Sequence, residues 1–287
     1  MSVGFATILL TFIVATLRAT TPLLLAALGG VFSERAGVVN IALEGIMLSG
    51  AWAAAYFSFI SGSAWVGLLG AVAVGVAMAG LHAVASIKYY ADQVVSGTAI
   101  NLLAVGFTEF MLNRVWGQAG GSPEVASLPN IFGLNLMIYL AFILAFVSWV
   151  ALYRTPWGLR LRSVGEHPLA ADTLGINVFR IRYYCTFLGG LVAGFAGAYF
   201  TLGSVGRFDE VMTAGRGFIA LVAVIFGRAH PTGVLLASLL FGVIDALGIR
   251  LQGAGLPSQV TGLLPFVVTL LTLVALRGRG LNRQGTA

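Results

Sequence analysis

Apolar runs about 20 residues long recur along almost the whole chain, and a helix that crosses a bilayer needs a run of that length. The runs are separated by short polar or glycine-containing breaks. A composition of 59% hydrophobic and 9% charged residues, with a mean hydropathy of +0.96, excludes a soluble domain. A membrane β-barrel would show alternation instead. The runs predict an all-α polytopic membrane bundle, with residues 1–287 forming one transmembrane domain.

We expect about nine apolar elements and 8–10 spans in this bundle. Residues 2–17 either extend the first span or form a separate interfacial helix that ends at Arg18, and we favour the separate helix. They have no basic leading region and no small-residue cleavage site before Arg18, so we expect them to be retained rather than removed as a signal peptide. The predicted elements are 19–33, 41–60, 64–87, 94–116, 131–153, 183–204, 213–229, 231–249 and 259–276.

The polar stretch 154–182 sets the predicted orientation. It carries five arginines against Glu166 and Asp172, and cytoplasmic loops are enriched in basic residues. Alternating outward from it places eleven of the sixteen basic residues inside, and the loop 117–130, which has no Lys or Arg, outside. The same bias accounts for the pI near 9.9 without a nucleic-acid partner, because the arginines lie at helix ends.

Two regions share a rhythm of a short segment, a break and a longer glycine-containing helix. Residues 40–55 and 65–84 form one pair, and residues 215–227 and 231–248 form the other. The alternation of spans places the pairs in opposite orientations, and an inverted repeat with interrupted helices is typical of transporters. The alternative is that any two helices rich in alanine and glycine look alike.

Several kinds of chemistry are absent from the sequence. The single lysine, Lys88, does not stand in a Gly-Lys-Ser/Thr phosphate-binding loop, so we expect no ATP hydrolysis by this chain. His82, His167 and His230 are far apart, and the lone Cys185 lies in an apolar run, where we expect it to pack. We therefore predict no metal, no cofactor and no enzyme activity.

Ionisable residues inside spans are costly and usually face a cavity or a partner. Glu44 lies four residues after Asn40, so both occupy one helix face, and Asn101 is a further polar residue in a span. One interpretation is that Asn40, Glu44 and Asn101 line a solute path. The other is that Glu44 pairs with Arg35 or caps a neighbouring helix end.

Two further acidic residues lie near basic ones along the chain. Glu109 precedes Arg114, and Asp245 precedes Arg250. For both we favour a structural ion pair.

The centre of the polar stretch predicts a short cytoplasmic helix. Pro168 suits the first helical position, "PLAADTL" supplies about two turns, and Gly175 suits a left-handed stop. Leu169, Ala170 and Leu174 fall with Thr173 on or near one side. This predicts a helix that enters a groove on another protein, and the alternative is a solvated basic loop that serves only topology. The candidate docking residues are Gly165, Glu166, His167, Pro168, Leu169, Ala170, Ala171, Asp172, Leu174 and Gly175.

At these residues the chain resembles a known family. "VGEHPLAADTLGI" resembles the cytoplasmic coupling segment of permease subunits in the branched-chain amino acid/ribose-type ABC importers. "ERAGVVNIALEGIMLSGAW", "DQVVSGTAINLLAVGFTEF" and "GRGFIALVAVIFGRAHPTG" are similar to the nucleoside (simple sugar) branch. His167 departs from the ribose branch, where Asn is usual and is a better helix cap.

The resemblance implies a permease subunit that imports a nucleoside or related polar solute through a bacterial inner membrane. It implies a cytoplasmic ATPase subunit that receives 168–174, a second permease subunit of different sequence and an extracytoplasmic substrate-binding protein. Gly37, Gly45, Gly215 and Gly227 would be its flexible points. The competing hypotheses are an ion-coupled secondary transporter, which also uses interrupted helices, and a membrane scaffold without transport.

Overall fold

The computed structural model describes residues 4–253, 258–265 and 267–268, and most of them are helical. Two short strands, β1 (Asn130–Ile131) and β2 (Leu134–Asn135), form an antiparallel hairpin. The helices are α1 (Phe5–Arg35), α2 (Leu43–Ser61), α3 (Ala64–Ala83), the π-helix η1 (Val84–Lys88), α4 (Gln93–Trp116), α5 (Leu136–Arg154), α6 (Pro156–Glu166), α7 (Pro168–Thr173), α8 (Val178–Ala198), the π-helix η2 (Tyr199–Val205), α9 (Arg216–Phe226), α10 (Pro231–Gly253) and α11 (Ser258–Gly262).

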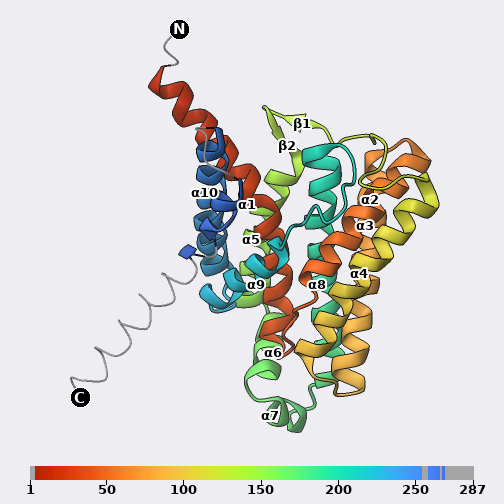
Figure 1. Cartoon of the computed structure of the whole chain (residues 1–287). Coiled ribbons are helices and arrows are strands. Elements are labelled where there is room, and N and C mark those ends of the chain that lie inside the picture. The colour runs from red at the N-terminus through yellow and green to blue at the C-terminus, as the bar shows by residue number, and fades with distance from the viewer. Residues whose placement is uncertain (1–3, 254–257, 266, 269–287) are drawn as a thin grey trace.

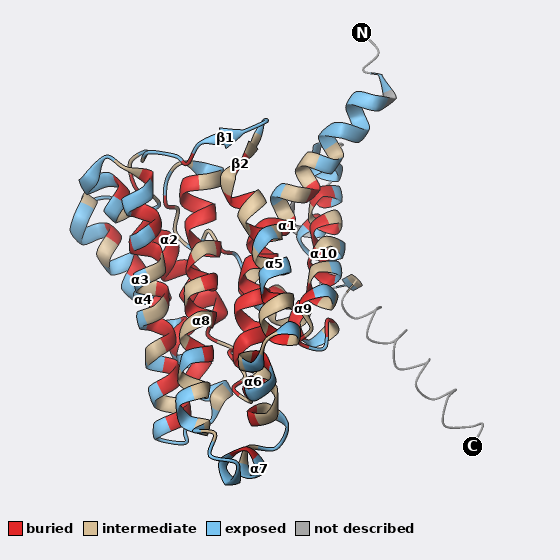
Figure 2. Cartoon of the chain, turned by 180° about the vertical axis from the view of Figure 1, so that it is seen from behind, coloured by how far each residue is buried: buried red, intermediate tan, exposed pale blue. Residues whose placement is uncertain are grey.

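Helices α1 and α8 form the centre of the bundle (Figure 1). On one side α2 and α3 pack against α8, with α4 outside α2, and on the other side α5, α9 and α10 pack against α1. Buried residues concentrate on the inner faces, whereas the outer faces of α3 and α4 are exposed (Figure 2). The exposed outer side chains are largely apolar, as expected for a surface in contact with lipid.

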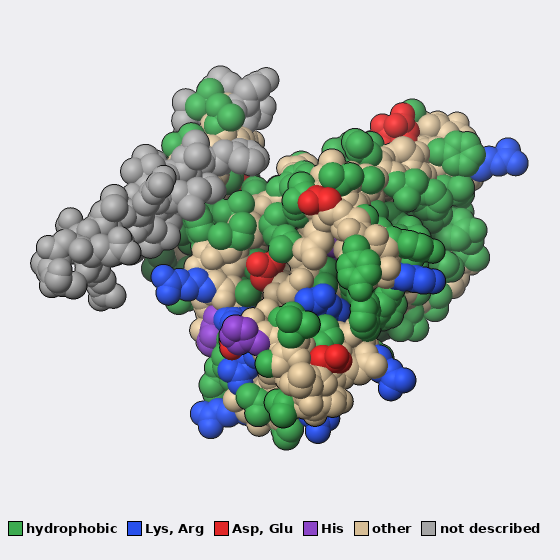
Figure 3. All heavy atoms as spheres, turned by 90° about the horizontal axis from the view of Figure 1, so that it is seen from below, with side chains coloured by type: hydrophobic (Ala, Val, Ile, Leu, Met, Phe, Trp, Pro, Cys, Tyr) green, Lys and Arg blue, Asp and Glu red, His purple; other side chains and the backbone are tan. Residues whose placement is uncertain are grey.

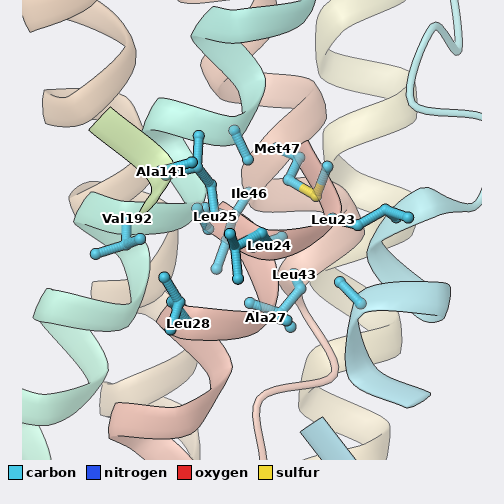
Figure 4. Close-up of a cluster of buried hydrophobic side chains, with 14 of the residues drawn as sticks. Leu23, Leu24, Leu25, Ala27, Leu28, Leu43, Ile46, Met47, Ala141 and Val192 are labelled. Atoms are coloured by element: carbon cyan, nitrogen blue, oxygen red, sulfur yellow. The ribbon is translucent and has the colours of Figure 1, made fainter. Parts of the chain in front are cut away.

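A cluster of buried hydrophobic side chains lies at the middle of α1 (Figure 4). Leu24, Leu25 and Leu28 are completely buried there, and Leu43 and Ile46 of α2 meet them. Because α1 is apolar all round along this stretch, neighbours can cover every side of it. The first predicted span therefore lies at the centre of the fold, surrounded by other helices.

Seven helices in the described part of the chain are long and apolar enough to cross a membrane, which confirms the predicted polytopic all-α fold. The predicted element 213–229 is instead a short helix, α9, of 11 residues. The pairs α2–α3 and α9–α10 run in opposite directions, as the alternation of spans predicts (Figure 1). Most of the predicted element 259–276 lies outside the described residues.

Two sequence-based expectations are wrong. Residues from Phe5 to Arg18 are not a separate interfacial helix, because α1 runs without a break to Arg35. The stretch 154–182 is not a loop with one short helix, because α6 fills 156–166. The local signal for α6 was a Thr155-Pro156 start: the Thr155 hydroxyl accepts a hydrogen bond from the amide of Gly158, and Pro156 occupies the first turn.

Glycines of α8 let neighbouring backbones approach closely. A Cβ on Gly190 would lie 2.5 Å from the carbonyl oxygen of Gly75 in α3, and one on Gly194 would lie 2.8 Å from that of Ala71. Real side chains do not tolerate such contacts. The small-residue spacing in "GGLVAGFAGAYF" is therefore a packing device, as expected.

Candidate functional site

The connection between α1 and α2 is an extended segment inside the bundle. It starts at Gly37, whose φ of +81° favours glycine, and α2 begins only at Leu43, a residue of the central core. His82 of α3 holds the segment through 3.1 Å contacts from its ring nitrogens to the Ser96 hydroxyl and the Val39 carbonyl oxygen. The backbone here is irregular at membrane depth, which requires protein partners for its polar groups.

Glu44 lies at the start of α2 and caps the beginning of α9. Its Oε1 accepts hydrogen bonds from the Thr213 hydroxyl at 2.6 Å and the Gly215 amide at 2.8 Å. Its Oε2 accepts one from the Gly217 amide at 2.6 Å. A helix N-terminus carries unpaired N–H groups and a partial positive charge, and a carboxylate satisfies both. Between pairing with Arg35 and capping a neighbouring helix, the structure shows the cap.

Arg35 holds the other end of α9. Its guanidinium donates to the carbonyl oxygens of Ala229 at 2.7 Å and Arg228 at 2.9 Å, just after α9 ends at Phe226. A cation at a helix C-terminus complements the helix dipole as an anion does at the N-terminus. Arg35 therefore does not pair with Glu44. Instead, Glu44 binds the N-terminus of α9 and Arg35 binds its C-terminus, and each carries the charge that complements the helix dipole there.

Asn40 lies in the same connection, and Asn101 reaches its end from α4. The Asn101 side chain accepts from the Gly45 amide at 2.8 Å and donates to the Ile41 carbonyl oxygen at 3.0 Å, which ties α4 to the start of α2. Asn40 accepts from the Ala42 amide at 3.1 Å, and its Nδ2 is buried without a partner among the described residues. The structure thus brings Asn40, Glu44 and Asn101 together around one backbone break.

Gly45 and Gly217 permit the close packing at this break. A Cβ on Gly45 would lie 2.9 Å from the Asn101 Cα, and one on Gly217 would lie 2.5 Å from the Glu44 Cα. Of the four predicted flexible glycines, Gly37 and Gly215 have positive φ, whereas Gly45 and Gly227 lie where backbones nearly touch. Their flexibility remains a prediction.

The two predicted short-range ion pairs do not form. Asp245 pairs with Arg216 at the start of α9, with 3.5 Å between Oδ2 and Nη2, while Arg250 donates to the Ile8 carbonyl oxygen and the Thr11 hydroxyl of α1. Glu109 forms no ion pair with Arg114 or another described residue. For Asp245, helix packing outweighs proximity along the chain.

The short predicted helix is present as α7 at the far end of the molecule from β1 and β2 (Figure 1). Gly175 adopts φ +79°, and the Ile176 amide donates to the Ala171 carbonyl oxygen, which closes the helix. His167 makes no side-chain cap. Leu169 and Leu174 are 85% and 80% exposed, and Lys and Arg side chains are spread over this end (Figure 3).

The predicted docking residues divide into an outer and an inner set. Ala171 is buried, and Gly165 packs on the backbone of Arg35 so closely that a Cβ there would collide with the Arg35 carbonyl oxygen. These two residues hold the segment to the bundle. The exposed members are Glu166, His167, Leu169, Ala170, Asp172, Leu174 and Gly175, and Pro168 is half-buried.

A hollow of about 330 Å³ separates the end of α6 from the end of α9, and Arg35, Arg162 and Arg228 face Glu34 and Glu166 around it. Nearby, the ring of His230 packs on that of Tyr153, with 4.4 Å between the centroids. Burial first, and then the charge of Arg35, lowers the pKa of His230 below its ordinary value. The end of α9 therefore lies beside the end of α6 in a basic environment.

Comparison with known families agrees with this geometry. The family model described as the permease component of branched-chain amino acid transport systems matches residues 12–273. The chain belongs to this permease family. It is accordingly a permease component of an ABC importer and a multi-pass protein of the bacterial inner membrane.

Relatives of this permease carry related names. The guanosine ABC transporter permease protein NupQ of Bacillus subtilis is 41% identical, covering 92% of this chain and 91% of its own. The nucleoside ABC transporter permease protein NupC of Lactococcus lactis is 38% identical, with 91% and 90% covered. TsgC13 of Haloferax volcanii, named as a glucose ABC transporter permease protein, is 38% identical, with 90% and 84% covered.

Among solved structures, an inward-facing metal-chelate type ABC transporter resembles the permease with a TM-score of 0.56. It is 18% identical, and the match covers 95% of this chain and 90% of the other. At that identity the likeness shows the fold alone, which is that of an ABC transporter membrane subunit.

Proposed function

We propose that the permease translocates a nucleoside or a related sugar-like solute into the cytoplasm, driven by ATP hydrolysis on a separate ATPase subunit that binds α7. The observation that carries the proposal is the exposed apolar face of α7 on an otherwise basic end of the molecule. Two leucines more than three-quarters exposed on a capped helix suit a groove on a partner better than water. The names of NupQ and NupC support the class of solute.

The same proposal includes a second permease subunit of different sequence and an extracytoplasmic binding protein, as membership of an importer family leads us to expect. The loop 117–130 supports this part of the proposal, because it offers the binding protein a rigid outer surface. The amides of Ser122, Val125 and Leu128 donate to the carbonyl oxygens of Phe208, Gly206 and Leu202 at 2.7–2.8 Å, which fixes the loop across the end of η2.

Asn40, Glu44 and Asn101 belong to this proposal as residues that border the solute path. Their location supports it, because the path has to cross the level at which α2 and α9 both begin inside the bundle. The Nδ2 of Asn40, which is buried without a partner among the described residues, also supports it. Glu44 and Asn101 would act chiefly by holding the α2 and α9 starts in position.

The docking role of α7 is tested by Leu169→Glu in the reconstituted transporter. We expect stimulation of the ATPase by the permease to fall by roughly tenfold, since a buried anchor of an interface is lost. Tyr89→Glu, at a residue that is 69% exposed in another cytoplasmic turn, is the matched control. Full stimulation by the Leu169 variant would contradict docking on α7.

The ion-coupled alternative is separated from this proposal by the source of energy. Vesicles that contain the permease without an ATPase should accumulate no solute on a proton or sodium gradient. Uptake under those conditions would remove the ABC mechanism from consideration.

A further inference from the structure

One cavity among the described residues has charged side chains in its wall at membrane depth. It encloses about 600 Å³, in the range of small-molecule sites, and lies between α1, η2, α9 and α10. A second hollow of about 320 Å³ shares Arg216, Asp245 and Ile249 with it. The Arg216–Asp245 ion pair therefore stands between two hollows. Asp245 is about 21 Å along α10 from its cytoplasmic start, well inside the membrane-spanning region.

This ion pair has hydrogen-bonding capacity to spare. The 3.5 Å separation is long for a charged hydrogen bond, and both side chains are about 30% exposed. Neither side chain makes another hydrogen bond to a described residue, in contrast to Glu44, whose carboxylate accepts three. A charge pair at membrane depth with unsatisfied donors and acceptors is costly, and such pairs mark functional sites.

Aromatic rings stand beside the pair. Phe200 and Tyr199 belong to η2, a π-helix, and π-helical turns concentrate at functional sites. The Phe200 centroid is 5.6 Å from the Arg216 guanidinium carbon, and both aromatic residues line the larger cavity. Tyr199 donates its hydroxyl to the Arg18 carbonyl oxygen, which anchors η2 to α1. A flat solute placed here has a ring face next to a donor and an acceptor.

We propose that this cavity is a solute site that selects nucleosides whose base carries a lactam edge, a carbonyl next to a ring N–H, over bases with an amino group beside an unprotonated ring nitrogen. The inference rests on the proposed nucleoside solute. A guanidinium next to a carboxylate presents a donor beside an acceptor, which complements C=O beside N–H. Guanine, hypoxanthine and uracil have this edge. With the ribose on the same side, adenine and cytosine present the reverse order, which sets donor against donor and acceptor against acceptor. A base turned over to restore the match would carry its ribose to the opposite side of the ion pair.

Glu44 is a positioning residue for this site. It holds the amides of Gly215 and Gly217, which flank Arg216 on either side. The start of α9, and with it the guanidinium of Arg216, is therefore fixed from α2. Arg18 adds a further positive charge to the cavity wall, which favours the carbonyl oxygen of the solute.

The test uses 6-thioguanosine, which crosslinks under near-ultraviolet light, in right-side-out membrane vesicles that hold the assembled transporter. We expect crosslinks to peptides from α1, η2, α9 or α10. Guanosine and uridine should block them at concentrations roughly tenfold lower than adenosine and cytidine, the discrimination expected of one paired edge. Asp245→Asn should bring the ratio of these two blocking concentrations close to one, because the asparagine amide both donates and accepts. Arg250→Gln, on the same helix but outside the cavity, should leave the ratio unchanged.

Arg216→Lys is the second variant, since it keeps the charge but loses the flat donor fork, and we expect it to reduce the ratio in part. Both variants work with the same binding protein as the wild type. A change in the ratio of blocking concentrations therefore arises in the permease. Crosslinks elsewhere, or an unchanged ratio in both variants, would overturn the lactam site while ATP-driven uptake continued. Absence of ATP-dependent nucleoside uptake in the wild type, with cavity crosslinks still blocked selectively, would instead count against the proposed transport function alone.

Discussion

At the residue scale, the chain shows which side chains matter more readily than what they touch. Glu44, Asn40 and Asn101 stand out because a polar group in an apolar span needs a partner. The partner of Glu44 lies 169 residues or more away, in a glycine-containing stretch with no charge pattern that points back to α2. Asp245 misled the prediction for the same reason, since Arg250 is near in sequence and Arg216 is near in space.

Glu44→Gln is expected to destabilise the permease by about 2 kcal/mol. The substitution removes the negative charge at the α9 N-terminus and turns one acceptor into a donor that faces an N–H group. Thermal unfolding in detergent measures the loss. Glu124→Gln, an exposed glutamate of the outer loop, is the control and should change little. Equal stability of the Glu44 variant would show that the carboxylate does not hold α9.

At the element scale, long amphipathic or apolar helices were predictable, and irregular pieces were less so. Helix α7 was predicted from Pro168 and Gly175, because the residues that begin and end a helix are local signals. Helix α6 was not predicted despite its Thr155-Pro156 start, because the arginines of this stretch favoured a polar loop. The sequence predicts one longer segment, 213–229, in place of the short α9. The ends of α9 depend on contacts with Arg35 and Glu44, which are remote in the sequence.

Gly165→Ala is expected to uncouple ATP hydrolysis from transport. The added methyl group collides with the backbone of Arg35, which also holds the end of α9, so the joint between α6 and α9 is pushed apart. We expect the solute moved per ATP hydrolysed to fall by roughly tenfold. Gly106→Ala in α4, where a Cβ meets nothing within 4 Å, is the control. Normal stoichiometry in the Gly165 variant would remove this joint from the coupling route.

At the scale of the whole molecule, the positive-inside rule and the hydrophobic runs carried the prediction. They predict that the helix ends next to basic residues lie on one side of the membrane together with α7. The structure places these ends of α1, α3, α5 and α8 on one side of the bundle (Figure 1). The relative positions of the helices could not be read from the sequence. They follow from glycine contacts such as Gly75 with Gly190, which only three-dimensional packing reveals.

The lone cysteine makes the orientation easy to measure. Cys185 is buried, so wild-type protein should give almost no background with a membrane-impermeant maleimide. Leu174→Cys should react only from the cytoplasmic side. Phe132→Cys, at the exposed tip between β1 and β2, should react only from outside. The opposite pattern would invert the topology and separate α7 from any cytoplasmic ATPase.

The cap of Glu44 on α9 has a consequence for the order of assembly. The carboxylate and the three groups that donate to it, on Thr213, Gly215 and Gly217, are 169 to 173 residues apart. A ribosome adds about 5–20 residues per second, so on the order of 10–30 s passes between their synthesis. During that interval the start of α2 carries an uncompensated carboxylate, which favours a location near the water interface. Completion of the inner half of the bundle therefore waits for the last third of the polypeptide.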